Sequence, residues 1–413
     1  MMIAIAGFDT EGRSSYDYFL AQGHELTILD QKQELDTPVG ASIVLGPDYL
    51  AGLDRFDLII RTAGLPPSLI FKVNPGLDPT KVTTQVNEFL KLCPSGNVVG
   101  VTGTKGKGTT STLIAKMLEA AGFEVQLAGN IGVPALNILP LVTTKSCVVL
   151  ELSSFQLIDL QRSPSIAVCL MVVPEHLNWH ANMNEYVIAK SQLFDHQTAS
   201  DLAIYFAENE SSVAIAAHGV GRKLPFYTSP GAEIINGAIT IGNTVICQTS
   251  ELIMLGEHNW QNACAAVTAA SQLTSDTNAL RSVLTTFSGL PFRIELRRTV
   301  SDITYFNDSF ASVGGASIAA IAAITGPKVM IIGGFDRGLD LQNFAKTIQD
   351  SANNIRHVLL IGQSARRMAD NLESAGFNNF TVSDATSMSA IVAAAAGLAQ
   401  SGDAVVLSPG FPS

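Results

Sequence analysis

The chain has 413 residues and carries 25 Lys and Arg against 36 Asp and Glu, which gives a formal net charge of −11. This acidic balance argues against nucleic acid or an anionic membrane as the main partner. The length allows two to four domains of roughly 100–200 residues each, and no uninterrupted apolar run reaches the ~18 residues of a membrane span. The five cysteines form no C-x-x-C pair and the first residues lack a basic signal region, so we expect a protein of the reducing cytoplasm.

The first module covers residues 1–92 and opens like a Rossmann unit. Apolar residues at 3–6 and 26–29 predict two strands, and residues 12–21 predict a helix between them. The connecting turn, GFDTEG, lacks the middle glycine of a dinucleotide fingerprint, so it is weak evidence for nucleotide binding. Asp30 closes the second strand at a position typical of ribose binding, but aspartate also commonly ends strands.

The most informative stretch lies in the second module, residues 93–290. An apolar run at 98–101 precedes the glycine-rich segment GTKGKGTT at 103–110, and residues 111–122 have a helical pattern. Strand, glycine-rich turn, Lys, Thr and helix form the layout of a phosphate-binding loop, in which backbone N–H groups and the helix N-terminus surround phosphate oxygens. Lys107 can reach the β and γ phosphates, and a Thr hydroxyl can bind Mg²⁺. We expect ATP binding here; the alternative is a surface turn before a helix.

Polar residues follow two further predicted strands of this module, at 147–152 and 166–173. Parallel strands collect chemistry at their carboxyl ends, so Glu151 can hold Mg²⁺ there, although a lone Glu can also be a cap or a solvated charge. His176 and His180 suggest a metal, but the further ligands that zinc needs are not found. We interpret His176 as a neighbour of Mg²⁺ or substrate phosphate, and His180 as structural.

Two helices of the second module carry polar residues of interest. Lys190 lies on a helix predicted at 184–194, where a lysine is usually a solvated charge. Asn259 and Asn262, near the start of a later helix, are three residues apart and share a face. Paired amides can read an adenine edge, but an Asn near a helix start is also an ordinary cap.

The third module, residues 291–413, is a second and smaller Rossmann-like unit. Strands are predicted at 303–306, 328–333, 357–362 and 404–407, with helices at 316–325, 341–351 and 388–400. Arg293 can supply a cation to the γ-phosphate. Asp308 follows the first of these strands and offers an acceptor to a ribose or a metal-bound water. Short strands that alternate with helices through all three modules predict an α/β fold with parallel sheets.

Taken in order, these motifs resemble the Mur ligase family. The resemblance rests on the glycine-rich loop, ELSSFQL at 151–157, His176, YVIAK at 186–190, GEHN at 256–259, Arg293 and NDS at 307–309. It covers all three modules, and ELSSFQL is especially characteristic of the branch that adds glutamate to UDP-N-acetylmuramoyl-L-alanine. The resemblance implies an ATP-dependent ligase that activates a carboxylate as an acyl phosphate and joins D-glutamate to it in peptidoglycan precursor synthesis. It also implies a cytoplasmic monomer whose partners are a UDP-linked muramoyl substrate and an amino acid.

The resemblance further implies roles for individual residues and two Mg²⁺ ions. The catalytic set is Lys107, Glu151, His176, Lys190 and Arg293. The ATP site comprises Gly103, Thr104, Lys105, Gly106, Lys107, Gly108, Thr109, Thr110, Asn259, Asn262, Arg293 and Asp308. The substrate contacts are Thr10, Glu11, Asp30, Gln31, Gly64, Asn130, Ser153, Arg337 and Ser413. The metal ligands are Thr109, Glu151, His176 and Lys190, the last as a carbamate formed from its neutral amine and CO₂.

Three features depart from the family pattern. Phe310 stands where this branch usually has Lys, and a Phe cannot pair with a carboxylate or a phosphate. Arg337 stands where Lys commonly contacts the incoming glutamate, which keeps the charge but changes its geometry. The helix expected after Ser413 is missing, so we expect the third module to be incomplete at its C-terminus.

These departures leave the incoming amino acid and its chirality open, so that L-glutamate can take the place of D-glutamate. The extra glycine of the loop is typical of folylpolyglutamate synthetases, relatives with the same chemistry on another acceptor, although those enzymes begin directly at the phosphate loop. The same chemistry on a pseudomurein-like precursor, or a nucleotide-binding homologue without ligase activity, is also compatible with the motifs. An NAD oxidoreductase is disfavoured by the incomplete glycine fingerprint and by the phosphate loop.

Overall fold

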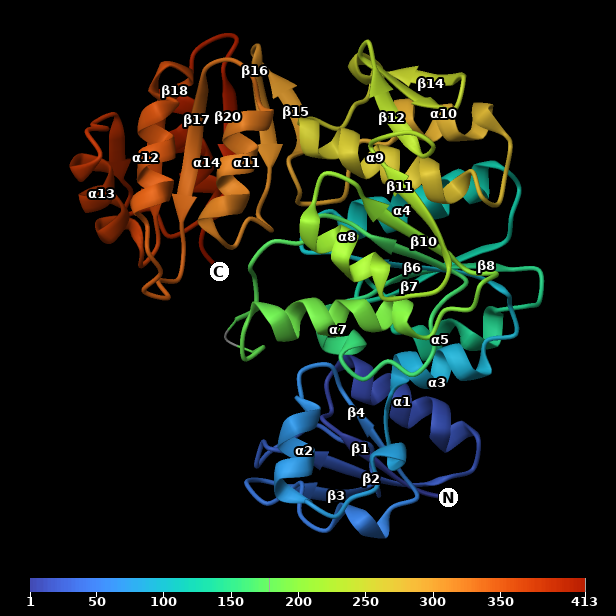
Figure 1. The fold of residues 1–413 in the computed structure, drawn as a ribbon. Helices are drawn as coiled ribbons and strands as arrows, with labels where there is room; N and C mark the ends of the chain where they lie inside the picture. Colours follow the sequence, from blue (N-terminus) through green and yellow to red (C-terminus); the bar gives the residue numbers. More distant parts are fainter. Residues whose placement is uncertain (178, 413) are drawn as a thin grey trace. The chain divides into compact units, whose positions relative to one another are not determined.

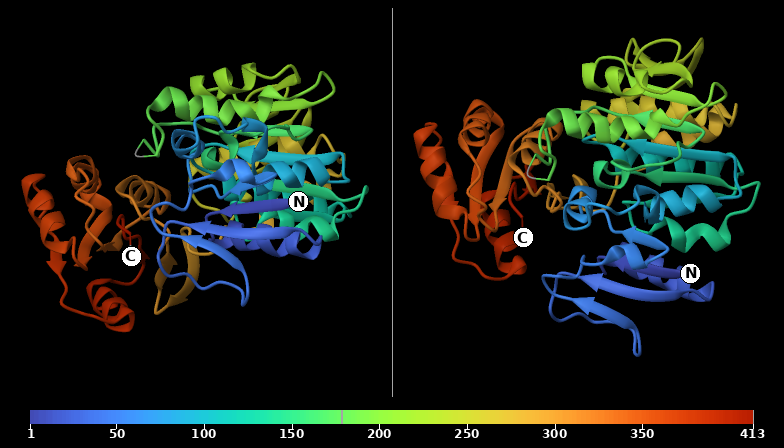
Figure 2. Two further views of the ribbon diagram at one scale, coloured as in Figure 1. Left: turned by 90° about the horizontal axis from the view of Figure 1, so that it is seen from below. Right: turned by 60° about the horizontal axis from the view of Figure 1, so that its bottom comes forward.

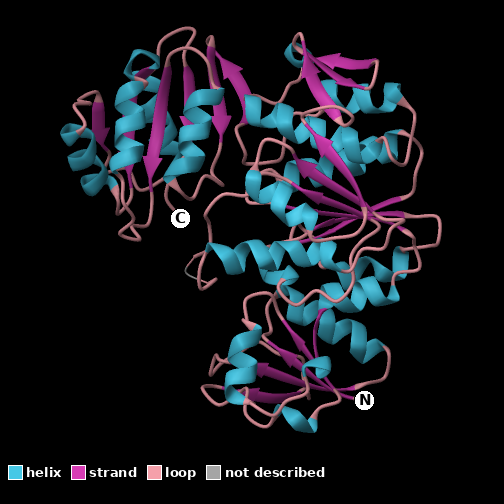
Figure 3. Cartoon of the chain, in the orientation of Figure 1, coloured by secondary structure: helices cyan, strands magenta, loops and turns pink. Residues whose placement is uncertain are grey.

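The computed structural model describes residues 1–177 and 179–412 of the chain. The chain divides into two compact units. The first comprises Met1–Glu251 and Gln261–Thr285, and the second comprises Leu252–Trp260 and Thr286–Ser413. Within the described ranges the strands form four sheets, whose strands and helices are distinguished in Figures 1 and 3.

A parallel five-stranded sheet begins the first unit. Its elements are β1 (Met2–Ala6), α1 (Thr10–Ala21), β2 (Glu25–Asp30), β3 (Ser42–Leu45), β4 (Leu58–Arg61), α2 (Pro67–Val73), β5 (Val82–Thr84) and α3 (Gln85–Leu92). The strand order is β3-β2-β1-β4-β5, and every neighbouring pair is parallel. Ile3 and Ile5 of β1 pack into one apolar cluster, whereas Ala4 and Ala6 pack into another. The sheet is therefore buried on both faces, as parallel sheets are.

A second parallel sheet of six strands forms the centre of the first unit. Its elements are β6 (Asn97–Thr102), α4 (Lys107–Ala120), β7 (Val125–Gly129), α5 (Ala135–Ile138), β8 (Cys147–Glu151), α6 (Ser154–Leu157), β9 (Ile166–Cys169), α7 (Met183–Asp195), β10 (Leu202–Phe206), α8 (Glu210–Ala217) and β11 (Arg222–Phe226). The order is β11-β10-β9-β6-β8-β7. After β6 the chain therefore adds β7 and β8 on one side of β6, and then β9, β10 and β11 on the other side. Ligands of doubly wound sheets bind where the strand order reverses in this way, outside the carboxyl ends of the strands.

A small antiparallel sheet and two helices complete the first unit. The elements are β12 (Ala232–Ile235), β13 (Ala238–Ile241), β14 (Thr244–Gln248), α9 (Glu257–Ala270), whose first residues group with the second unit, and α10 (Thr277–Thr286). This sheet was not predicted from the sequence. Asn236 and Gly237, which join β12 to β13, both have positive φ angles, of 50° and 76°. An Asn-Gly pair between apolar runs is the sequence signal of such a hairpin and could have revealed it.

The second unit contains a six-stranded mixed sheet. Its elements are β15 (Glu295–Val300), β16 (Ile303–Asn307), α11 (Gly314–Ala323), β17 (Lys328–Gly333), α12 (Gln342–Asp350), β18 (Ile355–Ile361), α13 (Ala365–Ser374), β19 (Phe380–Val382), α14 (Met388–Leu398) and β20 (Ala404–Leu407). The order is β15-β16-β20-β17-β18-β19; β15 and β16 are antiparallel and the other pairs are parallel. Further views of these strands and of the helices beside them are given in Figure 2.

The predicted α/β class with parallel sheets is confirmed. One predicted strand is too long, because β9 ends at Cys169 and residues 170–173 form an irregular segment. Short 3₁₀ turns lie at Leu53–Arg55, Pro79–Lys81, Leu139–Leu141, Thr249–Glu251 and Ala352–Asn354. Among the described residues, none of the helices has the length and apolar character needed to cross a membrane. A sheet lies within each of the three predicted modules, and the boundaries at residues 92 and 290 stay predictions.

Candidate active site

The glycine-rich loop connects β6 to α4 at the carboxyl edge of the central sheet. Gly103 and Gly106 have φ angles of 147° and 87°, which side chains rarely adopt. A Cβ atom on Gly103 would lie 2.7 Å from Cβ of Leu170, and one on Gly106 would lie 2.1 Å from Oδ1 of Asn262. Both glycines are thus required by conformation and by close packing. Gly108, Thr109 and Thr110 follow in the first turn of α4, where backbone N–H groups point outward.

The side chains of the loop are held by the surrounding chain. Nζ of Lys107 donates to the carbonyl oxygens of Gly103 at 3.1 Å and Thr104 at 3.0 Å. The hydroxyl of Thr104 is buried and donates to the carbonyl of Val173 at 3.0 Å, and Nζ of Lys105 lies 2.6 Å from Oε1 of Glu175. Thr104 therefore anchors the loop to the segment after β9, while Lys107 lies along the loop backbone.

Glu151 ends β8, the neighbour of β6, and faces the same edge of the sheet. It pairs in register with Val101, one residue before the end of β6. The side chain is largely buried, and its Oε1 accepts a hydrogen bond from Nδ2 of Asn130 at 2.8 Å. The structure thus brings together Glu151 and Asn130, which the sequence placed in the metal site and the substrate site respectively.

Lys190 was interpreted from its helix alone as a solvated charge, and that interpretation is wrong. The side chain is only 1% exposed, and its Nζ donates to the carbonyl of Gly103 at 2.9 Å and lies 3.3 Å from Oγ1 of Thr102. The same amine lies 4.6 Å from the centre of the Tyr186 ring. Burial, and then the positive charge of Lys107, lower the pKa of Lys190 to about 7. A large fraction of this amine is therefore neutral at physiological pH, directly beneath the glycine-rich loop.

His176 lies in the segment that follows β9 and has a positive φ of 59°. Its ring packs edge-on against Phe155, with the ring centres 4.8 Å apart. Partial burial lowers the pKa of His176, and the nearby Glu175 opposes this effect, so the imidazole is mainly neutral at pH 7. A neutral imidazole retains a lone pair for a metal ion or a hydrogen bond.

His180 is buried and lies in an aromatic cluster with Phe155, Trp179 and Tyr186. Its Nε2 lies 2.9 Å from the hydroxyl of Ser154, at the start of α6. These contacts support the structural interpretation of His180.

Asn262 of α9 lies against the glycine-rich loop. Its Oδ1 is 3.4 Å from Oγ1 of Thr110, and the side chain is largely buried. Asn259 lies one turn earlier on α9, and its Nδ2 donates to the carbonyl of Leu255 at 2.7 Å. The predicted adenine contacts of both residues stay predictions.

The predicted substrate contacts of the N-terminal sheet follow β1 and β2. Thr10 begins α1, and both carboxylate oxygens of Glu11 accept hydrogen bonds, from Nε2 of Gln156 at 2.6 Å and from the N–H of Ala63 at 2.9 Å. The Asp30 carboxylate accepts from the N–H groups of Phe8 at 2.9 Å and Lys32 at 3.0 Å. Glu11 thus joins the start of α1 to the loop after β4 and to α6, and Asp30 orders the loops after β1 and β2.

The remaining predicted contacts of this unit are Gln31, Gly64 and Ser153. Gln31 follows β2 and is exposed, and the carbonyl of the exposed Gly64 accepts from Nε1 of Trp179 at 3.4 Å. Ser153 caps α6 in a reciprocal capping box with Gln156. The substrate contacts of these three residues stay predictions.

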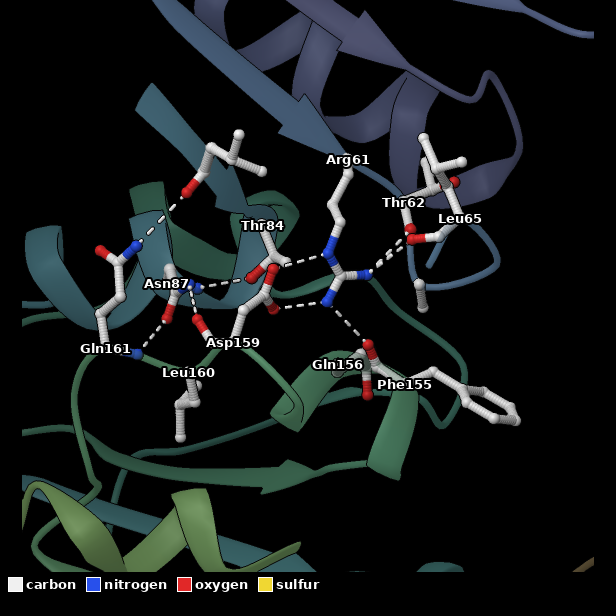
Figure 4. Close-up of polar contacts among 12 residues, drawn as sticks. Arg61, Thr62, Leu65, Thr84, Asn87, Phe155, Gln156, Asp159, Leu160 and Gln161 are labelled. Carbon is white, nitrogen blue, oxygen red and sulfur yellow. Dashed lines mark hydrogen bonds and ion pairs between the residues drawn. The ribbon is translucent and has the colours of Figure 1, made fainter. Parts of the chain in front are cut away.

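A buried polar network around Arg61 was not foreseen from the sequence (Figure 4). Arg61 ends β4, and its side chain is fully buried. Its guanidinium pairs with both carboxylate oxygens of Asp159, with Nε at 2.7 Å from Oδ2, and donates from Nη2 to the carbonyl of Phe155 at 2.9 Å. Nη1 donates to the carbonyls of Thr62 and Leu65, each at 3.2 Å. We call Arg61, Asp159 and the Phe155 carbonyl the Arg61 network.

Asn87 of α3 adds to this connection between the N-terminal and central sheets. Its Nδ2 donates to the carbonyl of Asp159, and its Oδ1 accepts from the N–H of Gln161, both at 2.9 Å (Figure 4). Arg61 lies 98 positions from Asp159 in the sequence, so no local pattern could predict the pair. The only signal was a charged residue that ends an apolar strand.

The second unit carries the remaining predicted site residues, Arg293, Asp308 and Arg337; Ser413 lies outside the described residues. Arg293 is exposed at the start of this unit, and Asp308, which is largely buried, accepts from the hydroxyl of Ser408 at 2.7 Å and the N–H of Ile294 at 3.1 Å. Burial raises the pKa of Asp308, and the hydrogen bond from Ser408 opposes that rise.

Arg337 lines a small pocket of about 40 Å³ in the second unit, after β17. The pocket also contacts Asp336 and Arg367, whose side chains form an ion pair with Nε of Arg367 2.7 Å from Oδ2 of Asp336. This ion pair connects α13 to the loop that contains Arg337. The backbone of that loop is therefore held in place beside the pocket.

The residues at the edge of the central sheet fit Mg²⁺ better than zinc. Among the described residues, no three His, Cys, Asp or Glu side chains lie together as a metal-binding group. Mg²⁺ is usually held by one or two carboxylates together with substrate phosphates and water, so Glu151 beside a phosphate loop is sufficient for it. Zinc would require a closed set of protein ligands that the described residues lack.

The fold and the site define an α/β protein whose glycine-rich loop, of the kind that surrounds phosphate, opens at the carboxyl edge of its central sheet. Residues 101–270 match the Mur ligase middle domain, and residues 292–411 match the glutamate ligase domain of Mur ligases. The chain belongs to the Mur ligase family, which confirms the resemblance seen in its motifs.

Curated relatives and solved structures agree with this assignment. The chain is 30% identical over 428 residues to a protein of Clostridium kluyveri named UDP-N-acetylmuramoylalanine–D-glutamate ligase, and the match covers 98% of this chain and 91% of the relative. It is 32% identical over 431 residues to a protein of the same name from Acetivibrio thermocellus, with the same coverage. The structure of MurF from Acinetobacter baumannii has a TM-score of 0.64 at 17% identity and covers 99% of this chain and 87% of that chain. The MurF ligase of Thermotoga maritima, solved with ADP, has a TM-score of 0.59 at 16% identity, with 98% and 90% covered.

Proposed function

We propose that this chain is an ATP-dependent ligase that joins D-glutamate to UDP-N-acetylmuramoyl-L-alanine. The observation that carries the proposal is the buried Lys190, whose pKa is lowered to about 7, beneath the glycine-rich loop and on the sheet edge where Glu151 lies. A protein that only binds nucleotides does not need a buried amine in that position. The names of the relatives, which match over nearly their whole length, supply the acceptor and the amino acid. We also propose that it works as a monomer in the cytoplasm.

The reaction proceeds in two covalent steps. An oxygen of the acceptor carboxylate attacks the γ-phosphorus of ATP, the bond to the bridging oxygen breaks, and ADP leaves. The amine of glutamate then attacks the carbonyl carbon of the acyl phosphate and forms a tetrahedral oxyanion. The oxyanion expels inorganic phosphate and the amine loses its proton, which leaves an amide. Backbone N–H groups of the loop and the Lys107 ammonium compensate the charge that moves onto phosphate oxygens.

Mg²⁺ fits this site, and four residues would hold it. Thr109 lies within the first turn of α4, and Glu151 lies at the end of β8. His176 lies in the segment after β9, and Lys190 lies on α7. The ion, when bound, supplies positive charge that polarises the phosphoryl oxygens. The protein residues orient the phosphates and keep water away from the acyl phosphate.

We propose that Lys190 serves this site as a carbamate. The neutral amine of Lys190 attacks CO₂, a nitrogen–carbon bond forms, and one proton is released, which converts the buried neutral amine into an anion. The lowered pKa of Lys190 makes the neutral amine available for this step. The carbamate would add a carboxylate to a region in which the described residues offer few.

The second unit carries further residues that we assign to the nucleotide and the amino acid. Asn259, Arg293 and Asp308 are proposed to contact ATP, and Arg337 the carboxylate of the incoming amino acid. Arg337 lines the pocket after β17, and its fixed loop supports this assignment. An arginine in this position can bind a carboxylate through two parallel hydrogen bonds.

The first test is phosphate release from ATP and Mg²⁺ with UDP-N-acetylmuramoyl-L-alanine, in the presence of D-glutamate, L-glutamate or other amino acids. We expect release that requires both the UDP substrate and D-glutamate. Release with another amino acid would correct the assigned specificity, and stimulation only by a folate-type acceptor would correct the acceptor. Release that depends on neither partner would contradict the ligase.

A second test addresses Lys190 through a matched lysine. Lys328 of β17 is also 1% exposed, so Lys328→Ala removes an equally buried amine outside the proposed metal site. We expect Lys190→Ala to lower kcat by about a hundredfold, which is typical for residues that support a metal site, and formate to restore part of the rate by occupying the vacated position. We expect Lys328→Ala to affect stability and to leave kcat and formate dependence unchanged. Undiminished ligation by Lys190→Ala would contradict its assigned role.

A further inference from the structure

Phe155 contacts both the Arg61 network and the ring of His176. It is the second residue of α6, within the ELSSFQL segment, of which the proposed function uses Glu151. Its carbonyl accepts the 2.9 Å hydrogen bond from Arg61 in the Arg61 network. Its ring contacts His176, with centres 4.8 Å apart, and Trp179, with centres 4.7 Å apart.

The backbone of Phe155 is fixed by the N-terminal sheet. Arg61 is fully buried and is bound on several sides, so its guanidinium has little freedom to follow a displacement of α6 (Figure 4). A buried charge that loses a partner is costly, which ties the Phe155 carbonyl to the end of β4. A change in the position of the N-terminal sheet is thereby transmitted to α6.

The ring of Phe155 packs against His176, whose carbonyl accepts from the N–H groups of Trp179 and His180, each at 3.0 Å, and whose Nε2 lies 3.9 Å from Oε2 of Glu175. The His176 side chain is 44% exposed, and its backbone is in the left-handed region, which costs free energy for a residue with a Cβ. Such a conformation persists only when its surroundings hold it. The ring of Phe155 is the nearest aromatic contact of His176, since the centre of the Tyr186 ring is 6.3 Å away.

We infer that Phe155 is a positioning residue that couples the Arg61 network to the ring of His176. The inference rests on the proposed function, because it takes His176 as a ligand of the metal that accompanies ATP. In this arrangement the sheet proposed to bind the UDP substrate and the imidazole proposed to hold the metal are connected through one residue. The side chain of Phe155 contacts His176, and its backbone carbonyl accepts a hydrogen bond from Arg61. A substitution can therefore remove the ring contact and keep the backbone hydrogen bond.

The test compares Phe155→Leu with Phe206→Leu. The first keeps the backbone bond to Arg61 and removes the ring beside His176; the second removes a buried ring that stacks on Phe226, with centres 5.2 Å apart, elsewhere in the central sheet. The readouts are the Mn²⁺ affinity of the ADP-bound protein, measured by electron paramagnetic resonance, and kcat and KM for ATP. We expect Phe155→Leu to weaken Mn²⁺ binding by about ten- to a hundredfold, as for other residues that orient a metal ligand. Phe155→Tyr, which keeps the ring, should retain the affinity.

Phe206→Leu should lower the melting temperature and leave the Mn²⁺ affinity unchanged. Equal Mn²⁺ affinities in Phe155→Leu and the wild type would overturn the inference, and so would an equal loss in both leucine variants. If Phe155→Leu does not fold, Phe155→Met, which fills the space with a flexible apolar chain, replaces it in the same comparison.

A double-variant cycle tests the coupling to Arg61. Arg61→Lys keeps the charge but cannot bind Asp159 and the Phe155 carbonyl with one planar fork. We expect it to weaken Mn²⁺ binding less than Phe155→Leu, and the two effects to be non-additive, because both act through one residue. Strictly additive effects would show that the Arg61 network and the His176 contact are independent, which contradicts the coupling.

His176→Ala distinguishes this inference from the proposed function. If His176→Ala leaves the Mn²⁺ affinity unchanged, His176 is not a metal ligand and that part of the proposed function fails. If His176→Ala weakens Mn²⁺ binding but Phe155→Leu does not, the metal site stands and only the positioning role of Phe155 is wrong.

Discussion

At the scale of single residues, Phe310 replaces the lysine that the family pattern leads one to expect. In the structure its ring lies 5.5 Å from that of Phe292, edge to face, and 5.6 Å from the guanidinium carbon of Arg293. Its N–H donates to the carbonyl of Phe292 at 3.2 Å. Phe310 therefore offers no charge of its own, but it supports the charge of Arg293 through the face of an aromatic ring.

This contact predicts a modest role for Phe310 in nucleotide binding. An exposed cation–π contact contributes about 0.5–1 kcal/mol, so Phe310→Leu should raise KM for ATP about two- to fivefold and change kcat little. Initial rates at varied ATP measure this effect. Phe380→Leu, on the edge strand β19 of the same sheet, is the control and should leave KM unchanged. An unchanged KM in Phe310→Leu would show that the ring does not restrain Arg293.

Lys107 and Lys190 differ in how well the sequence predicts them. The glycine-rich loop around Lys107 is a local pattern, since the strand, turn and helix follow one another directly. The rule that a lysine on a helix is a solvated charge predicts the wrong environment for Lys190, which is buried. Tyr186 and Phe194, four residues before and after it, are both buried, so Lys190 lies on the apolar face of α7. That periodicity was available in the sequence and contradicted a solvated position.

At the scale of elements, the bounds of strands with strong apolar patterns were predicted within a few residues. The short strands β12–β14 and the pairing of distant strands were not predicted. The end of β9 was predicted too late, because the apolar residues 170–173 continue the pattern after the ladder with β6 and β10 has ended. The pairings that fix the site, such as β8 beside β6, are set by contacts between distant strands and have no local signal.

The amino ends of β18 and β20 carry an ion pair that makes the second unit sensitive to acid. Arg356 of β18 binds both carboxylate oxygens of Asp403, which precedes β20, with Nη2 2.9 Å from Oδ1. The hydrogen bonds from Arg356 lower the pKa of Asp403 in the folded protein. A folded-state pKa below the unfolded value adds stability above the unfolded pKa, and this stability is lost as the pH falls through the folded pKa.

Asp403→Asn should therefore reduce the melting temperature of the second unit by several degrees at pH 7 and much less near pH 2. The melting temperature of wild type should fall more steeply than that of the variant between about pH 4, the usual pKa of aspartate, and pH 2. Circular dichroism melts at a series of pH values measure both slopes. Parallel curves for wild type and variant would show that Asp403 does not titrate with a shifted pKa.

At the scale of the whole molecule, the N-terminal and central sheets of the first unit share a buried polar connection. Arg61, Asn87 and Glu11 reach from the N-terminal sheet to α6 and the residues after it. A buried connection of this kind favours cooperative unfolding of the two sheets, because either sheet alone would expose an unpaired charge. The second unit has its own apolar core around β17 and β18.

Asp159→Asn tests whether the N-terminal and central sheets unfold together and independently of the second unit. It leaves the fully buried Arg61 without a compensating charge, so we expect the first unit to lose about 3 kcal/mol of stability, near the lower end of what breaking a buried pair costs. Asp36→Asn removes the partner of Arg13 in an exposed pair, 3.3 Å apart, and should cost less than about 1 kcal/mol.

Hydrogen exchange followed by mass spectrometry in increasing urea reports each unit through its own peptides. Peptides of the N-terminal and central sheets should lose protection together in Asp159→Asn, while those of residues 303–407 should keep theirs. Loss confined to the N-terminal sheet would show that the Arg61 network does not join the two sheets into one cooperative body.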